Sequence, residues 1–379
     1  MKIFTCRRQL MFVVCLLLGC LSMQAADDGL ITEQVTLNGV VAGSLPTIIT
    51  DDNKNLITNL KINGEINGTD LKFIREMAGR SVSGDETEGK LSILDLSDTK
   101  IVSGGKRYFH DMVNGASYFT KDDEIGDNAF YQCSGLKSLT LPDGITLIGE
   151  KAFLSCTGLT NITIPKGVTF IGMSAFIYCR NLTSMTIPAG VTTISSFTFE
   201  GCTSLTNLTL PDGLTKIGDG AFGECSGLTN LTFPSSLTKI GDNAFYKCSG
   251  LKSLTLPNGL TEIGDNAFAY CSGLRSLTLP DGLTTIGAGI FQNCSSLMSL
   301  TIPSSITEVG SNAFDGCSSL NEVRYIIHDD LAAYVQRGHP DMNFKCPFRY
   351  YLNGKEITSL EIPTGVTSIK KNAFCGCTV

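Results

Sequence analysis

Hydrophobic positions recur along most of this chain with a period of 23 residues. One unit, from Leu136 to Cys156, reads LKSLTLPDGITLIGEKAFLSC, and two further residues complete the period. Its first part, L-x-x-L-x-L, ends in alternation and predicts a short strand with the leucines on one face. The PDG sequence then turns the chain, and I-x-x-I-G predicts a second short extended segment. The alanine, phenylalanine and cysteine of AFLSC would share one face of a short helix or 3₁₀ turn.

Two landmark residues of the unit keep this period without a slip. The phenylalanines are Phe130, Phe153, Phe176, Phe199, Phe222, Phe245, Phe268, Phe291 and Phe314, and a cysteine follows each of them by three residues. No single unit can bury its apolar face, but stacked units share one core. The L-x-x-L-x-L spacing at a period of about 20–29 residues is the leucine-rich repeat signature. We therefore predict one α/β leucine-rich repeat solenoid, with parallel strands on one face and short strands with helical or 3₁₀ turns on the other.

Irregular segments flank the regular repeats, which occupy residues 126–325. Residues 26–56 form an N-terminal segment, and residues 57–125 contain two isolated strand motifs, a helix and an insertion at 102–124. An aromatic insertion follows at 326–356, and residues 357–379 form a final incomplete repeat with its strand at 357–362. The period places the next leucine at position 380, so no C-terminal cap is visible. Either the reading frame is truncated or another chain covers the last edge.

The helix of the N-terminal region has clear boundaries in the sequence TDLKFIREMAG. Thr69 can act as its N-cap, and Gly79 can end it. Leu71, Ile74 and Met77 lie on one face and are expected to be buried.

Residues 1–25 predict an export signal. Three basic residues precede twelve mostly apolar ones at 10–21, which are too few to span a bilayer comfortably. One interpretation is cleavage after Ala25. The other is a lipobox, Leu17-Leu18-Gly19-Cys20, in which Cys20 would carry a lipid and supply the chain's membrane anchor. Both interpretations place the mature chain outside the cytoplasm.

The charge balance argues against two classes of partner. The chain has 29 basic and 36 acidic residues, a net charge of −7, which becomes −10 without the three cations of residues 1–25. Nucleic acids and anionic lipid surfaces attract clustered cations. We therefore expect neither as a partner.

The repeats resemble the BspA-like class of bacterial leucine-rich repeats. The unit IPxGVTxIGxxAFxxCxxLTxL is matched by IPKGVTFIGMSAFIYCRNLTSM (Ile164 to Met185) and IPTGVTSIKKNAFCGC (Ile362 to Cys377), and the resemblance covers about residues 57–379. It implies a secreted or surface-exposed protein. Some members of the class are adhesins that bind host matrix or plasma proteins such as fibronectin and fibrinogen. The resemblance supplies no catalytic residues.

The 15 cysteines raise the question of disulfides or metal sites. Three lie in residues 1–25, ten occupy one repeat position that ends at Cys377, and Cys346 and Cys375 are irregular. Zinc sites need ligands clustered four to a centre, and no regular unit contains C-x-x-C. Neighbours in the column would be about 5–10 Å apart, so disulfides fit only at the short limit. We favour a column of small buried residues, and leave Cys346 and Cys375 open.

Other motifs offer little chemistry. Residues 218–223 spell G-x-G-x-x-G, but a dinucleotide site needs this sequence between a strand and a long helix. Asp51-x-Asn53-x-Asn55 lacks the glycine and glutamate of a calcium loop. The three histidines, His110, His328 and His339, all lie outside the regular repeats, which argues against an enzyme. We expect no cofactor and no metal.

Two surfaces remain as candidates for ligand binding. The first is a row of outward threonines on the strand face, represented by Thr186, Thr209 and Thr232; threonine also simply favours strands. The second is the pair of insertions, which would either cap the repeats or carry recognition residues. Their candidates are Arg107 and Tyr108 in the first insertion and Tyr334, Arg337, Arg349, Tyr350 and Tyr351 in the second.

These patterns favour an extracellular binding or adhesion protein that recognises a protein ligand. A structural spacer without a specific ligand is the main alternative, and an enzyme is the second.

Overall fold

The computed structural model describes residues 29–328, 331–338, 348–359, 362–364, 366–370 and 373. The chain forms a parallel β-solenoid of about 13 turns, which confirms the predicted fold class. Its contacts divide it into two compact units, one ending at Val168 and the other beginning at Thr169. The expectations for residues 1–25, including Cys20, and for His339, Cys346, Cys375 and Cys377 lie outside the described residues.

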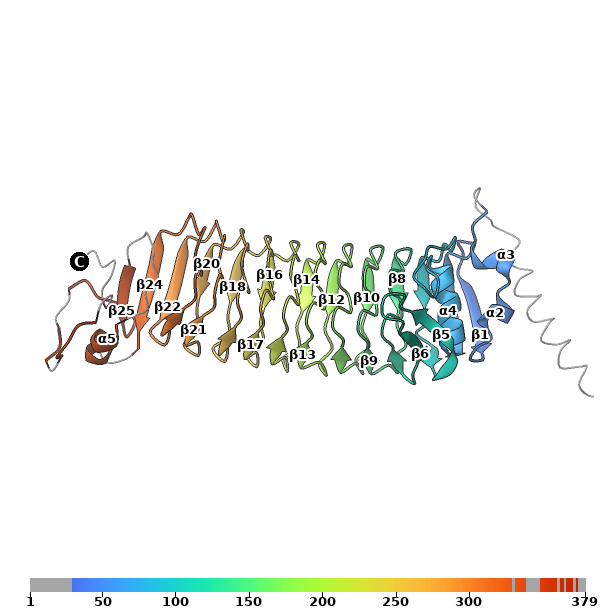
Figure 1. Cartoon of the computed structure of the whole chain (residues 1–379), viewed down its shortest axis with the longest axis horizontal. Helices are drawn as coiled ribbons and strands as arrows, with labels where there is room; N and C mark the ends of the chain where they lie inside the picture. Colours follow the sequence, from blue (N-terminus) through green and yellow to red (C-terminus); the bar gives the residue numbers. More distant parts are fainter. Residues whose placement is uncertain are drawn as a thin grey trace, which may run out of the picture. The chain divides into compact units, whose positions relative to one another are not determined.

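The first unit is built around one sheet of parallel strands in the order β1-β2-β3-β8-β10, with β4 also paired to β2 (Figure 1). Its described elements are β1 (Val35–Val40), α2 (Leu45–Ile48), α3 (Asp51–Lys54), β2 (Asn59–Ile66), α4 (Gly68–Met77), β3 (Ile93–Asp95), β4 (Thr99–Ile101), β5 (Gly104–His110), β6 (Ser117–Thr120), β7 (Glu124–Ile125), β8 (Ser138–Thr140), β9 (Leu147–Ile148) and β10 (Asn161–Thr163). Strand β1 lies in residues 26–56, which were expected to precede the repeats. Val35 pairs with Leu60 and Leu37 with Ile62, so the sheet begins before the first L-x-x-L-x-L motif.

Helix α4 has the buried face expected for it but a different N-cap. Leu71, Ile74 and Met77 are all buried. The cap is Asn67, whose side-chain oxygen accepts the Thr69 N–H at 2.9 Å, while the side chain of Asp70 accepts the Asn67 N–H at 3.0 Å. Thr69 was therefore wrongly predicted as the cap. A β-region residue that accepts from the first turn is what a cap requires, and Asn67 satisfies it.

The first insertion is an antiparallel hairpin, β5–β6, that packs on α4. The backbones approach so closely that a Cβ on Gly68 would lie 2.1 Å from the carbonyl oxygen of Lys106. The hairpin therefore needs glycine at this point of the helix. Because the hairpin covers the helix, the first insertion contributes to the fold of the first unit.

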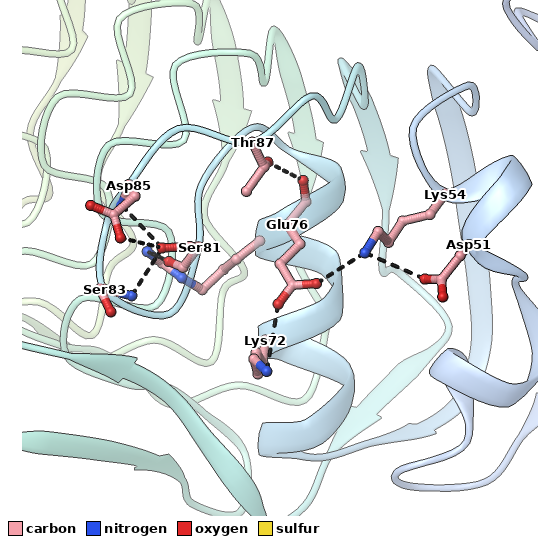
Figure 2. A network of polar contacts seen from close by, with 9 residues as sticks. Asp51, Lys54, Lys72, Glu76, Ser81, Ser83, Asp85 and Thr87 are labelled. Carbon is pink, nitrogen blue, oxygen red and sulfur yellow. Dashed lines mark hydrogen bonds and ion pairs between the residues drawn. The ribbon is translucent and has the colours of Figure 1, made fainter.

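A polar network joins α4 to the segments on either side of it (Figure 2). The Glu76 carboxylate lies 3.3 Å from Lys54 Nζ and 3.6 Å from Lys72 Nζ, and Lys54 also approaches Asp51 at 3.6 Å. The Thr87 hydroxyl donates to the Glu76 carbonyl at 2.6 Å. The Asp51-x-Asn53-x-Asn55 sequence is thus part of α3 and its C-cap, and its first carboxylate is paired with a lysine.

The second unit continues the same plan with two rows of strands. The first row contains β12 (Ser184–Thr186), β14 (Asn207–Thr209), β16 (Asn230–Thr232), β18 (Ser253–Thr255), β20 (Ser276–Thr278), β22 (Ser299–Pro303), β24 (Glu322–Ile327) and β25 (Phe348–Leu352). The second row contains β11 (Phe170–Ile171), β13 (Thr193–Ile194), β15 (Lys216–Ile217), β17 (Lys239–Ile240), β19 (Glu262–Ile263), β21 (Thr285–Ile286) and β23 (Glu308–Val309). These short second strands confirm the extended segments predicted from I-x-x-I-G. Helix α5 (Leu331–Arg337) and the antiparallel strand β26 (Lys355–Glu356) complete the unit.

The repeated phenylalanines stack along the core. In the second unit, Phe222 and Phe245 have ring centroids 5.3 Å apart with planes 12° apart, and Phe245 and Phe268 are 5.2 Å apart and 2° apart. All three rings are fully buried. Offset stacking at these distances adds to the free energy of burial, so each turn is held to the next by an aromatic contact.

The repeated cysteines form a hydrogen-bonded column beside these rings. The nine described thiols form no disulfides, and all but the half-buried Cys317 are buried. The Sγ of Cys225 donates to the carbonyl oxygen of Phe199 at 3.1 Å, and Cys248 bonds to Phe222 at 3.0 Å. Each thiol therefore links its turn to the preceding one, which supports the buried-column interpretation over metal ligation or disulfides for these cysteines.

The stretch around each repeated phenylalanine consists of hydrogen-bonded turns. A short helix or 3₁₀ turn was expected there. Two residues in most turns have a left-handed backbone, one at the position of Asn243 (φ 54°) and one at that of Lys247 (φ 57°). Asparagine and glycine tolerate this conformation best, which accounts for their frequency at the first position.

The second insertion proves to continue the sheet. In β24 and β25, Arg324 pairs with Arg349 and Tyr325 with Tyr350, in parallel register. The strand expected at 357–362 is not seen in its described residues, 357–359 and 362. The FRYYL sequence of β25 supplies this strand instead, and the chain then turns back through β26.

Candidate ligand-binding surface

The strand face of the second unit carries an outward row of threonines. Thr186 pairs with Thr209 in β12–β14, and Thr232 pairs with Thr255 in β16–β18. These threonines are exposed, while Met185 and the corresponding leucines point into the core. Alternation along each strand thus places one hydroxyl per turn at the surface. This arrangement also suits a purely structural row of β-branched residues.

The threonine row ends in two arginines. Thr301 pairs with Arg324, and Arg324 pairs with Arg349, so the three side chains occupy neighbouring strands on one face. Arg324 Nε lies 3.1 Å from Glu322 Oε1, and Arg349 Nη1 lies 3.6 Å from Glu356 Oε1. The arginine side chains remain 49% and 56% exposed. Two like charges on adjacent strands repel each other, and the two glutamates offset that repulsion.

Tyr351 belongs to the same cluster. It is half-buried and pairs with Ile326 on one side and Glu356 on the other. Hydrogen bonding to Glu322 raises the pKa of the Arg324 guanidinium, and Tyr351 and Glu356 add smaller contributions of the same sign. We call Glu322, Arg324, Arg349, Tyr351 and Glu356 the arginine cluster.

Two of the tyrosines predicted to bind ligand are core residues. Tyr334 of α5 and Tyr350 of β25 are buried and pack with Tyr325, with ring centroids 5.7–6.4 Å apart. The Tyr334 hydroxyl donates to the Ala373 carbonyl at 2.7 Å, and burial raises the pKa of this tyrosine. Because inward and outward positions alternate in β25, Arg349 and Tyr351 face outward while Tyr350 anchors the helix. Arg337, at the end of α5, is exposed.

Of the two candidates in the first insertion, one is buried and one is exposed. Tyr108 is buried and donates its hydroxyl to the Asp127 carbonyl at 2.8 Å, and burial raises its pKa. It is therefore a core residue of the first unit, contrary to its selection as a ligand contact. Arg107 is exposed on the hairpin, and its Nη1 lies 3.4 Å from the Ser117 hydroxyl.

The remaining motifs take ordinary structural positions. The G-x-G-x-x-G sequence at 218–223 follows β15 and lies in turns, without the helix of a dinucleotide site. Within the described residues, no group of three or more His, Cys, Asp or Glu side chains could hold a metal ion. In that same part of the chain, the helices are too short or too polar to cross a bilayer.

Comparison with known proteins identifies the family. The model of the BspA type leucine-rich repeat region matches this chain in 6 copies, over residues 123–252, 238–328 and 348–379. These ranges cover more than half of the sequence. The chain therefore belongs to the BspA-type leucine-rich repeat family, which confirms the resemblance noted in its repeats.

One solved structure agrees with this assignment. A leucine-rich repeat protein from Bacteroides ovatus is 26% identical, with a TM-score of 0.54, over 72% of this chain and 64% of that one. The chain thus spans somewhat less than two thirds of that relative's length. A leucine-rich cell surface protein from Faecalibacterium prausnitzii is 27% identical, with a TM-score of 0.30, over 62% of this chain and 79% of that one. No curated protein matched.

Proposed function

We propose that this chain is exported and binds an extracellular protein through the arginine cluster, without catalysis. The exposed Arg324–Arg349 pair with Tyr351 is the observation that carries the proposal. Arginine and tyrosine are the residue types that most often dominate protein–protein interfaces, together with tryptophan, and this chain contains no tryptophan. Export is supported by the signal-like residues 1–25, with either cleavage after Ala25 or lipid attachment at Cys20.

The cluster is suited to recognition because its charges are already placed. Glu322 and Glu356 hold the two guanidinium groups in position on neighbouring strands, so a ligand need not order two flexible side chains. A carboxylate of the partner could accept hydrogen bonds from one arginine fork. The aromatic ring of Tyr351 would contribute apolar contact beside it.

The test is a binding measurement on the mature chain, from residue 26 onward, with immobilised fibronectin and fibrinogen as first ligands. The triple variant Arg324→Gln, Arg349→Gln, Tyr351→Ser should bind at least about tenfold more weakly, the effect of losing one good anchor. Arg180→Gln, an exposed arginine outside both insertions, is the matched control and should bind normally.

Two further variants locate the site if the triple variant binds as the wild type does. Loss of binding in Thr186→Val, Thr209→Val, Thr232→Val would place it on the threonine row, and loss in Arg337→Gln would place it at the end of α5. Absence of binding to a broad set of matrix and plasma proteins would contradict the proposal and favour a structural spacer.

A further inference from the structure

A second exposed surface lies in the turns at residues 169–202, near the second row of strands. Phe170, Met173, Tyr178 and Phe197 are 49%, 41%, 37% and 39% exposed. Backbone bonds from Ser174 and neighbouring residues to the next turn show that these turns are adjacent. The four side chains therefore lie on two adjacent turns, and we call them the aromatic patch.

The fold does not require apolar residues at these positions. Two turns further on, the equivalent of Phe170 is Lys216 and that of Met173 is Asp219, and both are exposed. The turns of the second unit thus form the same backbone with charged side chains there. Exposed apolar side chains gathered on adjacent turns cost solubility, and such surfaces commonly mark interaction sites.

The aromatic rings are held in place by the next turn. An added Cβ on Gly220 would lie 2.4 Å from the Phe197 ring, and one on Gly201 would lie 2.3 Å from the Tyr178 ring. Phe197 and Tyr178 both have a left-handed backbone, with φ of 58° and 59°. This conformation is unfavourable for a bulky residue. Gly220 and Gly201 thus leave room for the Phe197 and Tyr178 rings to pack against the following turn.

An acidic row continues from the patch along the same sequence position. Asp219, Asp242 and Asp265 follow Met173 at multiples of 23 residues, with Ser196 between, and all three are exposed. Asp219 Oδ1 accepts the Asp242 N–H at 3.1 Å, and Asp242 Oδ1 accepts the Asp265 N–H at 2.8 Å. The backbone therefore fixes these carboxylates in a line that begins two strand spacings, about 10 Å, from Met173. Phe197 is one turn away, since its N–H donates to the Asp219 carbonyl at 2.8 Å.

Neighbouring charges leave this line acidic. Burial raises the pKa of Glu200, with Glu224 contributing in the same direction, and Glu224 is itself paired with Lys247 at 3.0 Å. On the row of Phe170, Lys216 and Lys239 are basic, and Lys239, which is paired with Glu262, also interacts electrostatically with Asp219 and Asp242. Asp219, Asp242, Asp265 and Glu262 together outweigh Lys216 and Lys239, so the two rows carry a net charge of −2 here.

We propose that the aromatic patch and the acidic row together bind a polypeptide segment of a partner protein that carries apolar anchor residues followed by lysine or arginine. The apolar anchors contact Phe170, Met173 and Phe197, and the basic residues lie along Asp219 and Asp242. This surface is separate from the arginine cluster, so its test does not depend on the function proposed above.

The test uses the mature chain and a displayed library of random peptides of about 12 residues, which can extend to about 40 Å. Peptides that bind the wild type are selected, and those that also bind the variant Phe170→Thr, Met173→Ser, Phe197→Asn are discarded. The new residues are those of Thr193, Ser196 and Asn243 at the same positions of later turns. The expected survivors combine apolar residues with lysine or arginine. Their affinity, measured by fluorescence anisotropy, should fall about tenfold or more in the variant.

Two control variants sharpen the result. Met298→Lys removes an equally exposed apolar side chain elsewhere in the second unit and should leave affinity unchanged. Asp219→Asn with Asp242→Asn keeps a side-chain oxygen that can accept the backbone N–H groups, and should weaken binding more at low salt than at high salt. Failure to recover discriminating peptides, or recovery of acidic ones, would overturn the proposal. Dimerisation of the wild type that the triple variant abolishes would also overturn it, by making a second copy the occupant.

Discussion

The buried arginine of α4 gives the sharpest prediction about stability. Arg75 is fully buried, and its Nη1 donates to the carbonyls of Asn128 and Ala129, both at 3.0 Å. Its Nη2 donates to the Ser81 carbonyl at 3.2 Å and to that of Tyr131 at 3.4 Å. Burial lowers the pKa of this guanidinium. One side chain therefore joins the helix to the turn that contains the first repeated phenylalanine.

The magnitude follows from opposing contributions when Arg75 is changed to methionine. The Asn128 and Ser81 carbonyls also accept a backbone N–H, so the loss falls mainly on two other carbonyls, at about 1–3 kcal/mol each. The contact of the guanidinium with the Phe109 ring, 5.0 Å away, adds about 1 kcal/mol or more. Relief from burying a charge acts in the opposite direction. We expect Arg75→Met to destabilise the first unit by about 2–4 kcal/mol.

Hydrogen exchange is the suitable measurement, because a solenoid can unfold in parts. Amides of α4 and β5 should exchange about 30-fold or more faster in Arg75→Met, while amides around Phe245 stay protected. The control is Arg107→Met, at an exposed arginine of the β5–β6 hairpin, and it should change these exchange rates little. Unchanged exchange in α4 would refute the reasoning, since it would mean that burying the guanidinium costs as much as its bonds return.

The cysteine column and Gly220 support further predictions. In the native protein, Cys317, whose pKa burial raises to about 11, should react with iodoacetamide faster than fully buried Cys225, as site-resolved mass spectrometry would show; equal rates would contradict the column. Folding holds these thiols protonated above their ordinary pKa of 9.0, so the free energy of unfolding should fall as pH rises from about 9 to 12; urea unfolding that is no easier at pH 10 than at pH 8 would argue against it. Gly220→Asn should destabilise by about 1–3 kcal/mol through its clash with the Phe197 ring. Adding Phe197→Asn should restore stability, because Asn243 and Asn266 occupy the same two positions in later adjacent turns. A thermal melt of the double variant tests this.

The regular part of the fold could be predicted because each turn repeats the same physical requirement. Phe222 and Cys225 recur because every turn needs one stacking ring and one small buried residue beside it. Strand β1 could not be found in this way, since its sequence, VTLNGV, lacks the repeat motif and pairs only through alternation. Strand β25 was missed for a related reason, because aromatic residues replace its leucines.

The candidate site was predictable in composition but not in orientation. The sequence places Arg349, Tyr350 and Tyr351 together, but which of them point outward depends on the register of β25 against β24. A shift of one residue would have exposed Tyr350 and buried Arg349. The same uncertainty applies to Tyr108, which the hairpin turns into the core. Glu322 and Glu356 were missed because their importance comes only from their distance to the arginines.

In a repeat protein, each residue can be compared with the residues at the same position of other turns. A residue that differs from them without a structural reason is a candidate functional residue. Gly220 departs from the asparagine of later turns, but the Phe197 ring that it accommodates explains the change. Phe170 and Arg324 depart from their rows without any such explanation within the fold, since Lys216 and Thr301 fill equivalent positions. The residues that the fold does not need are thus the strongest candidates for selection by a partner. They fall on two different rows of strands, so the two proposed surfaces should act independently, and losses of affinity measured for one ligand at each should be unaffected by variants of the other.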